Sequence, residues 1–96
     1  MDTQDRRQNF ADERARIQAL DMEIVRLLID RFQAADRIGA IKRELGLPIE
    51  DREREVVVLD AVAAEARRRS KDEALIDCIR ALYVSIISQS KMFQNR

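Results

Sequence analysis

The sequence predicts an all-α protein with three helices per chain, one long and two shorter. Its 96 residues include only two glycines and one proline, so few positions can end a helix. Apolar residues recur at steps of three and four, the spacing of one helix face, and no stretch shows the alternation of a half-buried strand. The one clear break is Gly46-Leu47-Pro48, a pattern typical of a helix stop.

The long first helix is predicted from Asp12 to Leu45, which is roughly 50 Å at 1.5 Å per residue. Two shorter helices of the same chain cannot cover so long an apolar face, so the sequence predicts an oligomer whose long helices pack side by side. The mostly polar residues 1–11 predict a flexible tail in front of a single domain over residues 12–96. The apolar face consists of Ile17, Leu20, Ile24, Leu27, Leu28, Phe32, Ala35, Ile38, Ile41 and Leu45.

The two shorter helices follow the proline. Asp51 is the expected N-cap of the second helix, which ends in the basic run Arg67–Arg69, a composition that suits the negative end of the helix dipole. Ser70 or Asp72 is expected to cap a third helix, Glu73–Gln94. The connection contains no glycine, so its geometry is less well specified by the sequence.

The composition excludes several classes of function. Eighteen basic and 18 acidic residues give no net charge, unlike the basic excess of nucleic-acid binders. No apolar run approaches the roughly 20 residues of a membrane span, and the polar N-terminal residues predict no signal peptide. Without histidine and with a single cysteine, the usual zinc sites and Ser-His or Cys-His nucleophiles are excluded. We expect a metal-free cytoplasmic protein with Cys78 as a small core residue.

Basic residues interrupt the apolar face of the long helix. Arg31 and Lys42 occupy heptad core positions, and they are eleven positions apart, which is about 20° more than three turns of helix. Both side chains therefore project the same way, roughly 16 Å apart, and can grip one small molecule. Arg14 lies roughly 25 Å from Arg31 and 100° around the helix, so it most simply joins such a site from another subunit.

Polar residues also interrupt the apolar faces of the shorter helices. Glu55 opens the face of the second helix, and Ser90 and Gln94 lie one turn apart on the third. A surplus of interior cations predicts an anionic ligand, a dicarboxylate or a phosphate, and arginine suits carboxylates best. A single basic residue at a core position is also typical of a device that fixes helix register, so a non-enzymatic dimerisation module remains an alternative.

In order and spacing, the sequence resembles the all-helical chorismate mutases along residues 12–94. The segments that carry the resemblance are Arg14–Asp21, Leu27–Arg31, Ile38–Lys42, Pro48–Glu55 with the pattern Pro-x-x-Asp-x-x-Arg-Glu, and Ile86–Gln94 with the ending Ser-x-x-x-Gln. The resemblance implies an intertwined homodimer that uses no cofactor and rearranges chorismate, a dicarboxylate, into prephenate on the route to aromatic amino acids. Such catalysis consists of positioning and electrostatic stabilisation.

The resemblance also implies roles for the residues singled out above. It implies that Arg31, Ser90 and the partner subunit's Arg14 hold the two carboxylates. It implies that Lys42 and Gln94 donate hydrogen bonds to the ether oxygen. Glu55, with Asp51 at the start of its helix, is implied to orient the ring hydroxyl, and Arg54 to line or brace the pocket.

Enzymes of the same fold with related substrates stay open as alternatives. An isochorismate-pyruvate lyase usually lacks the pair Arg54-Glu55, which disfavours it here. A 4-amino-4-deoxychorismate mutase is harder to distinguish, because Glu55 can bind an ammonium as well as a hydroxyl. A regulatory partner protein is not predictable from the sequence.

Overall fold

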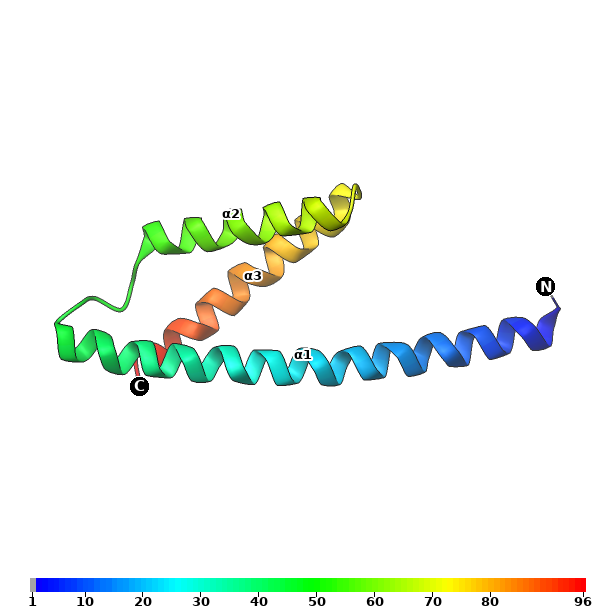
Figure 1. Cartoon of the computed structure of the whole chain (residues 1–96), viewed down its shortest axis with the longest axis horizontal. Helices are drawn as coiled ribbons and strands as arrows, with labels where there is room; N and C mark the ends of the chain where they lie inside the picture. The colour runs from blue at the N-terminus through cyan, green and yellow to red at the C-terminus, as the bar shows by residue number, and fades with distance from the viewer. Residues whose placement is uncertain (1) are drawn as a thin grey trace. The chain divides into compact units, whose positions relative to one another are not determined.

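A computed structural model describes residues 2–96 and contains three helices, α1 (Thr3–Leu45), α2 (Arg52–Arg69) and α3 (Glu73–Gln94) (Figure 1). Residues 2–96 contain no β-strand. The predicted all-α class, with one long and two shorter helices, is confirmed. Met1, the first residue of the predicted tail, lies outside the described residues.

The start of α1 differs from the prediction. The helix begins at Thr3 instead of Asp12 because Asp2 provides a cap, its Oδ1 accepting a hydrogen bond from the backbone N–H of Asp5 at 2.8 Å. No glycine or proline interrupts residues 3–11, so the helix continues through them. The predicted start is therefore wrong and residues 3–11 are helical, while the flexibility of this segment stays a prediction.

The end of α1 is confirmed at Leu45. Gly46 has a φ of +69°, the left-handed conformation that glycine adopts without a steric penalty. The N–H of Leu47 donates to the carbonyl of Lys42 at 2.8 Å, and that of Gly46 donates to the carbonyl of Arg43 at 3.3 Å. These two bonds form a Schellman motif, which satisfies carbonyls at the helix end and turns the chain towards α2.

The shorter helices begin where their caps predict. Asp51 accepts a hydrogen bond from the N–H of Arg54 at 3.0 Å and caps α2. Asp72 accepts from the N–H of Ala74 at 2.9 Å and caps α3, and the hydroxyl of Ser70 accepts from the N–H of Asp72 at 3.1 Å. Ser70 thus stabilises the short connection, and both helix ranges agree with the prediction.

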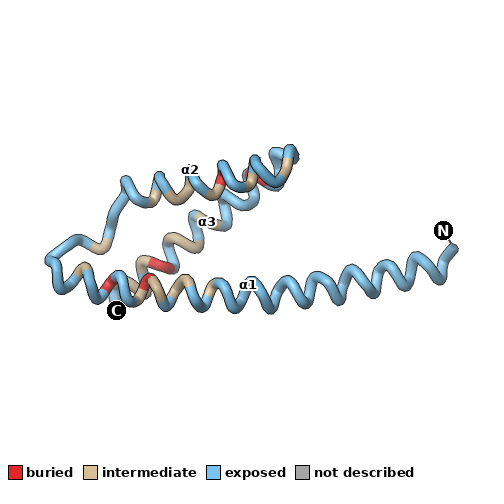
Figure 2. Tube along the Cα trace, in the orientation of Figure 1, coloured by how far each residue is buried: buried red, intermediate tan, exposed pale blue. Residues whose placement is uncertain are grey.

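The chain forms two compact units, of which one ends at Arg31 and the other runs from Phe32 to Arg96. In the second unit, α2 and α3 pack against each other around Ala63 and Ile76, which are 5% and 2% exposed. Ala35 and Gly39 are buried on the part of α1 that belongs to this unit (Figure 2). The core of the second unit is therefore small and consists largely of short side chains.

The first unit is a single helix without a core of its own. Residues 2–27 are all exposed, including the apolar side chains predicted to face a partner (Figure 2). Ile17, Leu20, Ile24 and Leu27 are each at least 50% exposed. A helix with such a face needs a partner to bury it.

Cys78 is exposed, which corrects the prediction of a core residue. The buried Ile76 faces α2, and a residue two positions further along lies about 200° around the helix axis. Within residues 2–96, no helix is long and apolar enough to cross a membrane. The same residues hold no group of three histidine, cysteine or acidic side chains placed to bind a metal.

Candidate active site

Lys42 and Gln94, which the family resemblance implies act on the same substrate atom, are in direct contact. The Lys42 ammonium donates to the side-chain Oε1 of Gln94 at 2.8 Å and to the backbone carbonyl of Ile49 at 2.9 Å. An ammonium has three N–H donors. Residues 2–96 occupy two of them in these hydrogen bonds, so one donor remains for a ligand. Because Oε1 is the atom that accepts from Lys42, the amide nitrogen of Gln94 keeps its own N–H donors for a ligand.

The close approach of α3 to α1 makes this contact possible. A Cβ atom on Gly39 would lie 2.6 Å from the Cα of Gln94 and closer still to its carbonyl oxygen. That carbonyl accepts a hydrogen bond from Arg43 at 2.9 Å. The absence of a side chain at Gly39 thus lets the backbone of α3 pack closely against α1, about one turn before Lys42. The hydrogen bond from Arg43 stabilises this end of α3 against α1.

Further contacts fasten the C-terminal end of α3. The rings of Phe32 and Phe93 stack with their centroids 5.1 Å apart and an angle of 19° between their planes. The guanidinium of Arg96 lies 4.7 Å from the centroid of the Phe93 ring and pairs with Asp36 at 3.3 Å. This ion pair lowers the pKa of Asp36, mainly through the hydrogen bond from Arg96. Gln94 is therefore held by neighbours on both sides.

Glu55 lies at the start of α2 and pairs with a lysine of α3. The Nζ of Lys91 lies 2.8 Å from Oε1 of Glu55 and 3.7 Å from Oε1 of Glu50. The pKa of Lys91 is raised, chiefly by its short polar contact with Glu55. Ile49 and Glu50 are consecutive, so this loop contributes one partner to Lys42 and one to Lys91. Lys42, Gln94, Lys91, Glu55 and Glu50 are referred to below as the polar cluster.

The remaining predicted residues of the second unit make local contacts. Ser90 is 5% exposed, and its hydroxyl donates to the carbonyl of Ile86 at 2.8 Å. Asp51 caps α2 by accepting a hydrogen bond from the backbone N–H of Arg54. Arg54 itself is exposed. Asp51 therefore fixes the turn of helix that carries Glu55.

Arg14 and Arg31 belong to the first unit. Arg14 lies over the ring of Phe10, with 4.3 Å from its guanidinium carbon to the ring centroid, and Arg31 is half-buried. Within the polar cluster, two lysines are balanced by two glutamates. The polar cluster itself therefore does not carry the surplus positive charge that the sequence predicted for the site.

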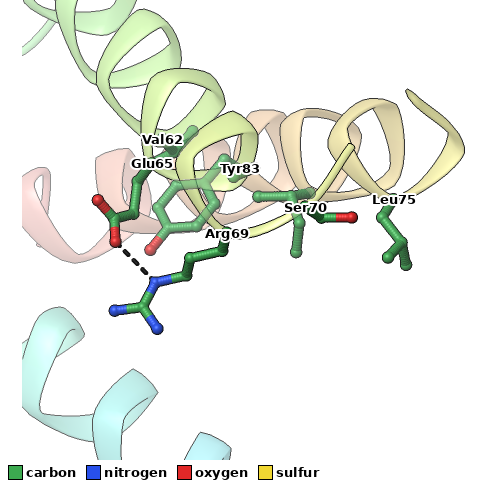
Figure 3. A pocket seen from close by; sticks show the side chains of 8 residues that line it. Val62, Glu65, Arg69, Ser70, Leu75 and Tyr83 are labelled. Carbon is green, nitrogen blue, oxygen red and sulfur yellow. Dashed lines mark hydrogen bonds and ion pairs between the residues drawn. The ribbon is translucent and has the colours of Figure 1, made fainter. Parts of the chain in front are cut away.

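A separate cavity of about 370 Å³ lies between α2 and the first half of α3 (Figure 3). Its lining is mostly apolar, with Val62, Ala66, Leu75, Ile79 and Tyr83, and at one side Arg69 pairs with Glu65 at 2.7 Å. Arg68 and Arg69 together lower the pKa of Glu65 to about 2. Such a lining suits apolar side chains rather than a dicarboxylate.

The polar cluster can position an anionic ligand and donate hydrogen bonds to it, and comparison with known proteins identifies the family. The model of the family "Chorismate mutase type II" matches residues 13–95. This chain belongs to that family, a class of isomerases, as the sequence predicted.

Two relatives illustrate the extent of the similarity. The chain is 32% identical over 66 residues to the chorismate mutase of Methanocaldococcus jannaschii, a match that spans 69% of this chain and 67% of that protein. It is 35% identical over 66 residues to the T-protein of Haemophilus influenzae, where the match spans 69% of this chain but only 18% of the T-protein. No solved structure matches at a significant level.

Three contributors to the site were not predicted from the sequence: Gly39, Lys91 and the carbonyl of Ile49. Glycine inside a helix costs about 1 kcal/mol relative to alanine, so its presence can signal a close packing contact. Lys91 lies three residues before Gln94, on a neighbouring part of the helix surface. The backbone carbonyl gives no signal, because any residue carries one.

Proposed function

We propose that this chain is a chorismate mutase that converts chorismate into prephenate. The observation that carries the proposal is the contact between Lys42 and Gln94, which leaves a lysine N–H and the amide nitrogen to act as donors. Membership of the chorismate mutase family supports the reaction, and the agreement between that family's site pattern and these residues supports the roles proposed below.

The reaction is an intramolecular rearrangement in which one ether C–O bond breaks as a new C–C bond forms. No proton is transferred and no nucleophile is required. Negative charge develops on the ether oxygen as its bond to the ring breaks, so hydrogen bonds from Lys42 and Gln94 strengthen in the transition state. This difference between ground state and transition state accelerates the reaction.

The substrate must also be folded so that its side chain lies over the ring. We assign Arg31, Ser90 and the partner subunit's Arg14 to the two carboxylates, because arginine binds carboxylates with two parallel hydrogen bonds. Glu55, whose helix start is fixed by Asp51, accepts a hydrogen bond from the ring hydroxyl, and Arg54 braces the pocket. Holding the reactive conformation supplies a further part of the rate.

We further propose that the active form is an intertwined homodimer whose single domain comprises residues 12–96. The exposed apolar face of α1, which includes Ile17, Leu20 and Ile24, supports it, because burial of such a face stabilises association. The apolar cavity between α2 and α3 is a suitable surface for a partner's side chains. A cytoplasmic location is proposed from the composition.

A direct assay tests the function. Purified protein is incubated separately with chorismate, isochorismate and 4-amino-4-deoxychorismate, and substrates and products are followed by chromatography. We expect prephenate from chorismate. Selective turnover of another substrate would reassign the reaction within the same fold, and no turnover of any would favour a helical dimerisation module.

The pH dependence of the rate provides an independent check. Gln94 is an amide and needs no proton to act as a donor, whereas a carboxyl group in its place would have to be protonated. We therefore expect activity that does not require acidic conditions. A rate that rises steeply below about pH 6 would contradict the role assigned to Gln94.

A further inference from the structure

Lys91 is not among the residues assigned to the reaction, yet it forms an ion pair with one of them. Its Nζ lies 2.8 Å from Oε1 of Glu55, and the side chains of Lys91 and Glu55 are 34% and 25% exposed. Oε1 is buried and, within residues 2–96, has no well-aligned hydrogen-bond partner, so Lys91 compensates it as a nearby charge. The charge of Glu55 is thus compensated before any ligand binds.

We infer that Lys91 is a specificity-determining residue, which makes Glu55 select a neutral hydroxyl on the substrate ring and reject an ammonium at the same position. The inference rests on the proposed function, in which Glu55 accepts a hydrogen bond from the ring substituent. It deepens that function by naming what distinguishes chorismate from its 4-amino analogue.

The selection follows from the charges around Glu55. An unpaired, half-buried carboxylate attracts a cation more strongly than a neutral donor, so Glu55 alone would favour the ammonium. With Lys91 at 2.8 Å, a substrate ammonium on Glu55 would lie beside a like charge in a partly desolvated site. A hydroxyl brings no charge, and the carboxylate retains lone pairs for it.

Neighbouring side chains keep Lys91 at this position. Its Nζ also lies 3.7 Å from Oε1 of Glu50, which in turn pairs with Arg52 at 3.5 Å. Glu50 is 55% exposed, and water therefore screens it more than it screens Glu55. Repulsion from a charge held in place is a recognised way to exclude a competing ligand.

The test compares kcat/KM for chorismate and for 4-amino-4-deoxychorismate in the wild-type protein and in Lys91→Met. We expect the ratio of the amino substrate to the hydroxyl substrate to rise about tenfold or more when the charge is removed. Lys91→Arg, which keeps the charge, should restore a ratio near the wild-type value. Lys71→Met, an exposed change in the connection between α2 and α3, is the matched control.

Two failures remain distinguishable. A wild-type protein that does not turn over chorismate would contradict the proposed function. A wild-type protein that is active on chorismate, with the same substrate ratio in folded Lys91→Met and Lys91→Gln, would overturn the inference alone. A loss of activity equal for both substrates would also overturn it, because a merely structural role for Lys91 predicts that result.

Discussion

The two parts of α1 carry the same apolar periodicity but differ in burial. Up to Arg31 the helix exposes large side chains, and Ile17 and Ile24 are 57% and 52% exposed. From Phe32 onwards the buried residues are small, Ala35 and Gly39, and α3 approaches closely at Gly39, while Ile38, Ile41 and Leu45 stay exposed. Periodicity therefore indicates which face of a helix will be buried, but residue size indicates how closely its neighbour approaches.

The difference separates two tasks. Small residues after Arg31 let the backbone of α3 approach, so that Lys42 and Gln94 meet within one chain. Large residues before it offer surface that a second chain can bury. Each of the following variants tests either the part of α1 up to Arg31 or the unit from Phe32 onwards. Their expected effects decrease in the order given.

Lys42→Ala should have the largest effect, on the side of the division that holds the site. It removes a donor to the ether oxygen and also the contact that orients Gln94. Loss of one such donor is expected to lower kcat/KM about 100- to 1,000-fold, measured with chorismate. Lys71→Ala is the control for a lost surface charge, and near-full turnover by Lys42→Ala would refute the assignment.

Ile24→Asp tests the other side. If the exposed face of α1 is buried between two chains, an aspartate there places an unpaired charge in the interface, which costs several kcal/mol per ion. We expect dimer affinity to fall about 100-fold or more, measured by sedimentation velocity over a range of concentrations. Gln18→Asp, on a different face of the same helix, should have little effect. Equal behaviour of the two variants would exclude this face as the interface.

Gly39→Ala should disturb the packing of α3 on α1. The added methyl group would lie 2.6 Å from the Cα of Gln94, so the backbone must shift. Overpacking of this kind costs about 1–3 kcal/mol and should also lower kcat by displacing Gln94. Gly46→Ala is the contrasting variant, because its Cβ meets nothing within 4 Å and only the positive φ is strained. It should lower the melting temperature while leaving kcat closer to wild type.

Asp36→Asn should have the smallest effect. It removes the ion pair with Arg96 that helps to hold the C-terminal end of α3 and should lower thermal stability slightly. Arg96 lowers the pKa of Asp36 in the folded protein. The pair therefore stabilises the fold above the ordinary carboxyl pKa of about 4, and this contribution is lost as the pH falls through the lowered value. The difference in thermal stability between wild type and variant should be present at pH 7, shrink below about pH 4, and weaken in high salt. A difference that grows on acidification would contradict the ion pair.

Most helix boundaries were predictable because their signals are local. Gly46 stops α1, and Asp51 and Asp72 cap the helices that follow. The start of α1 was missed because the cap at Asp2 lies in a segment whose polar composition suggested a tail. Lys42 and Gln94 were predictable as polar residues on apolar faces, whereas the contact between Lys91 and Glu55 joins separate helices and leaves no local pattern.

The sequence by itself determined the three helices, all their ends except the start of α1, the apolar faces and the polar residues on them, because each depends on residues within a few turns of one another. Only the tertiary structure decided that α3 packs closely against Gly39, that Lys91 compensates the charge of Glu55 and that Cys78 is exposed. These features depend on which residues meet between different helices, such as Glu55 with Lys91 or Gly39 with Gln94, and a periodic pattern within one helix carries no information about such partners.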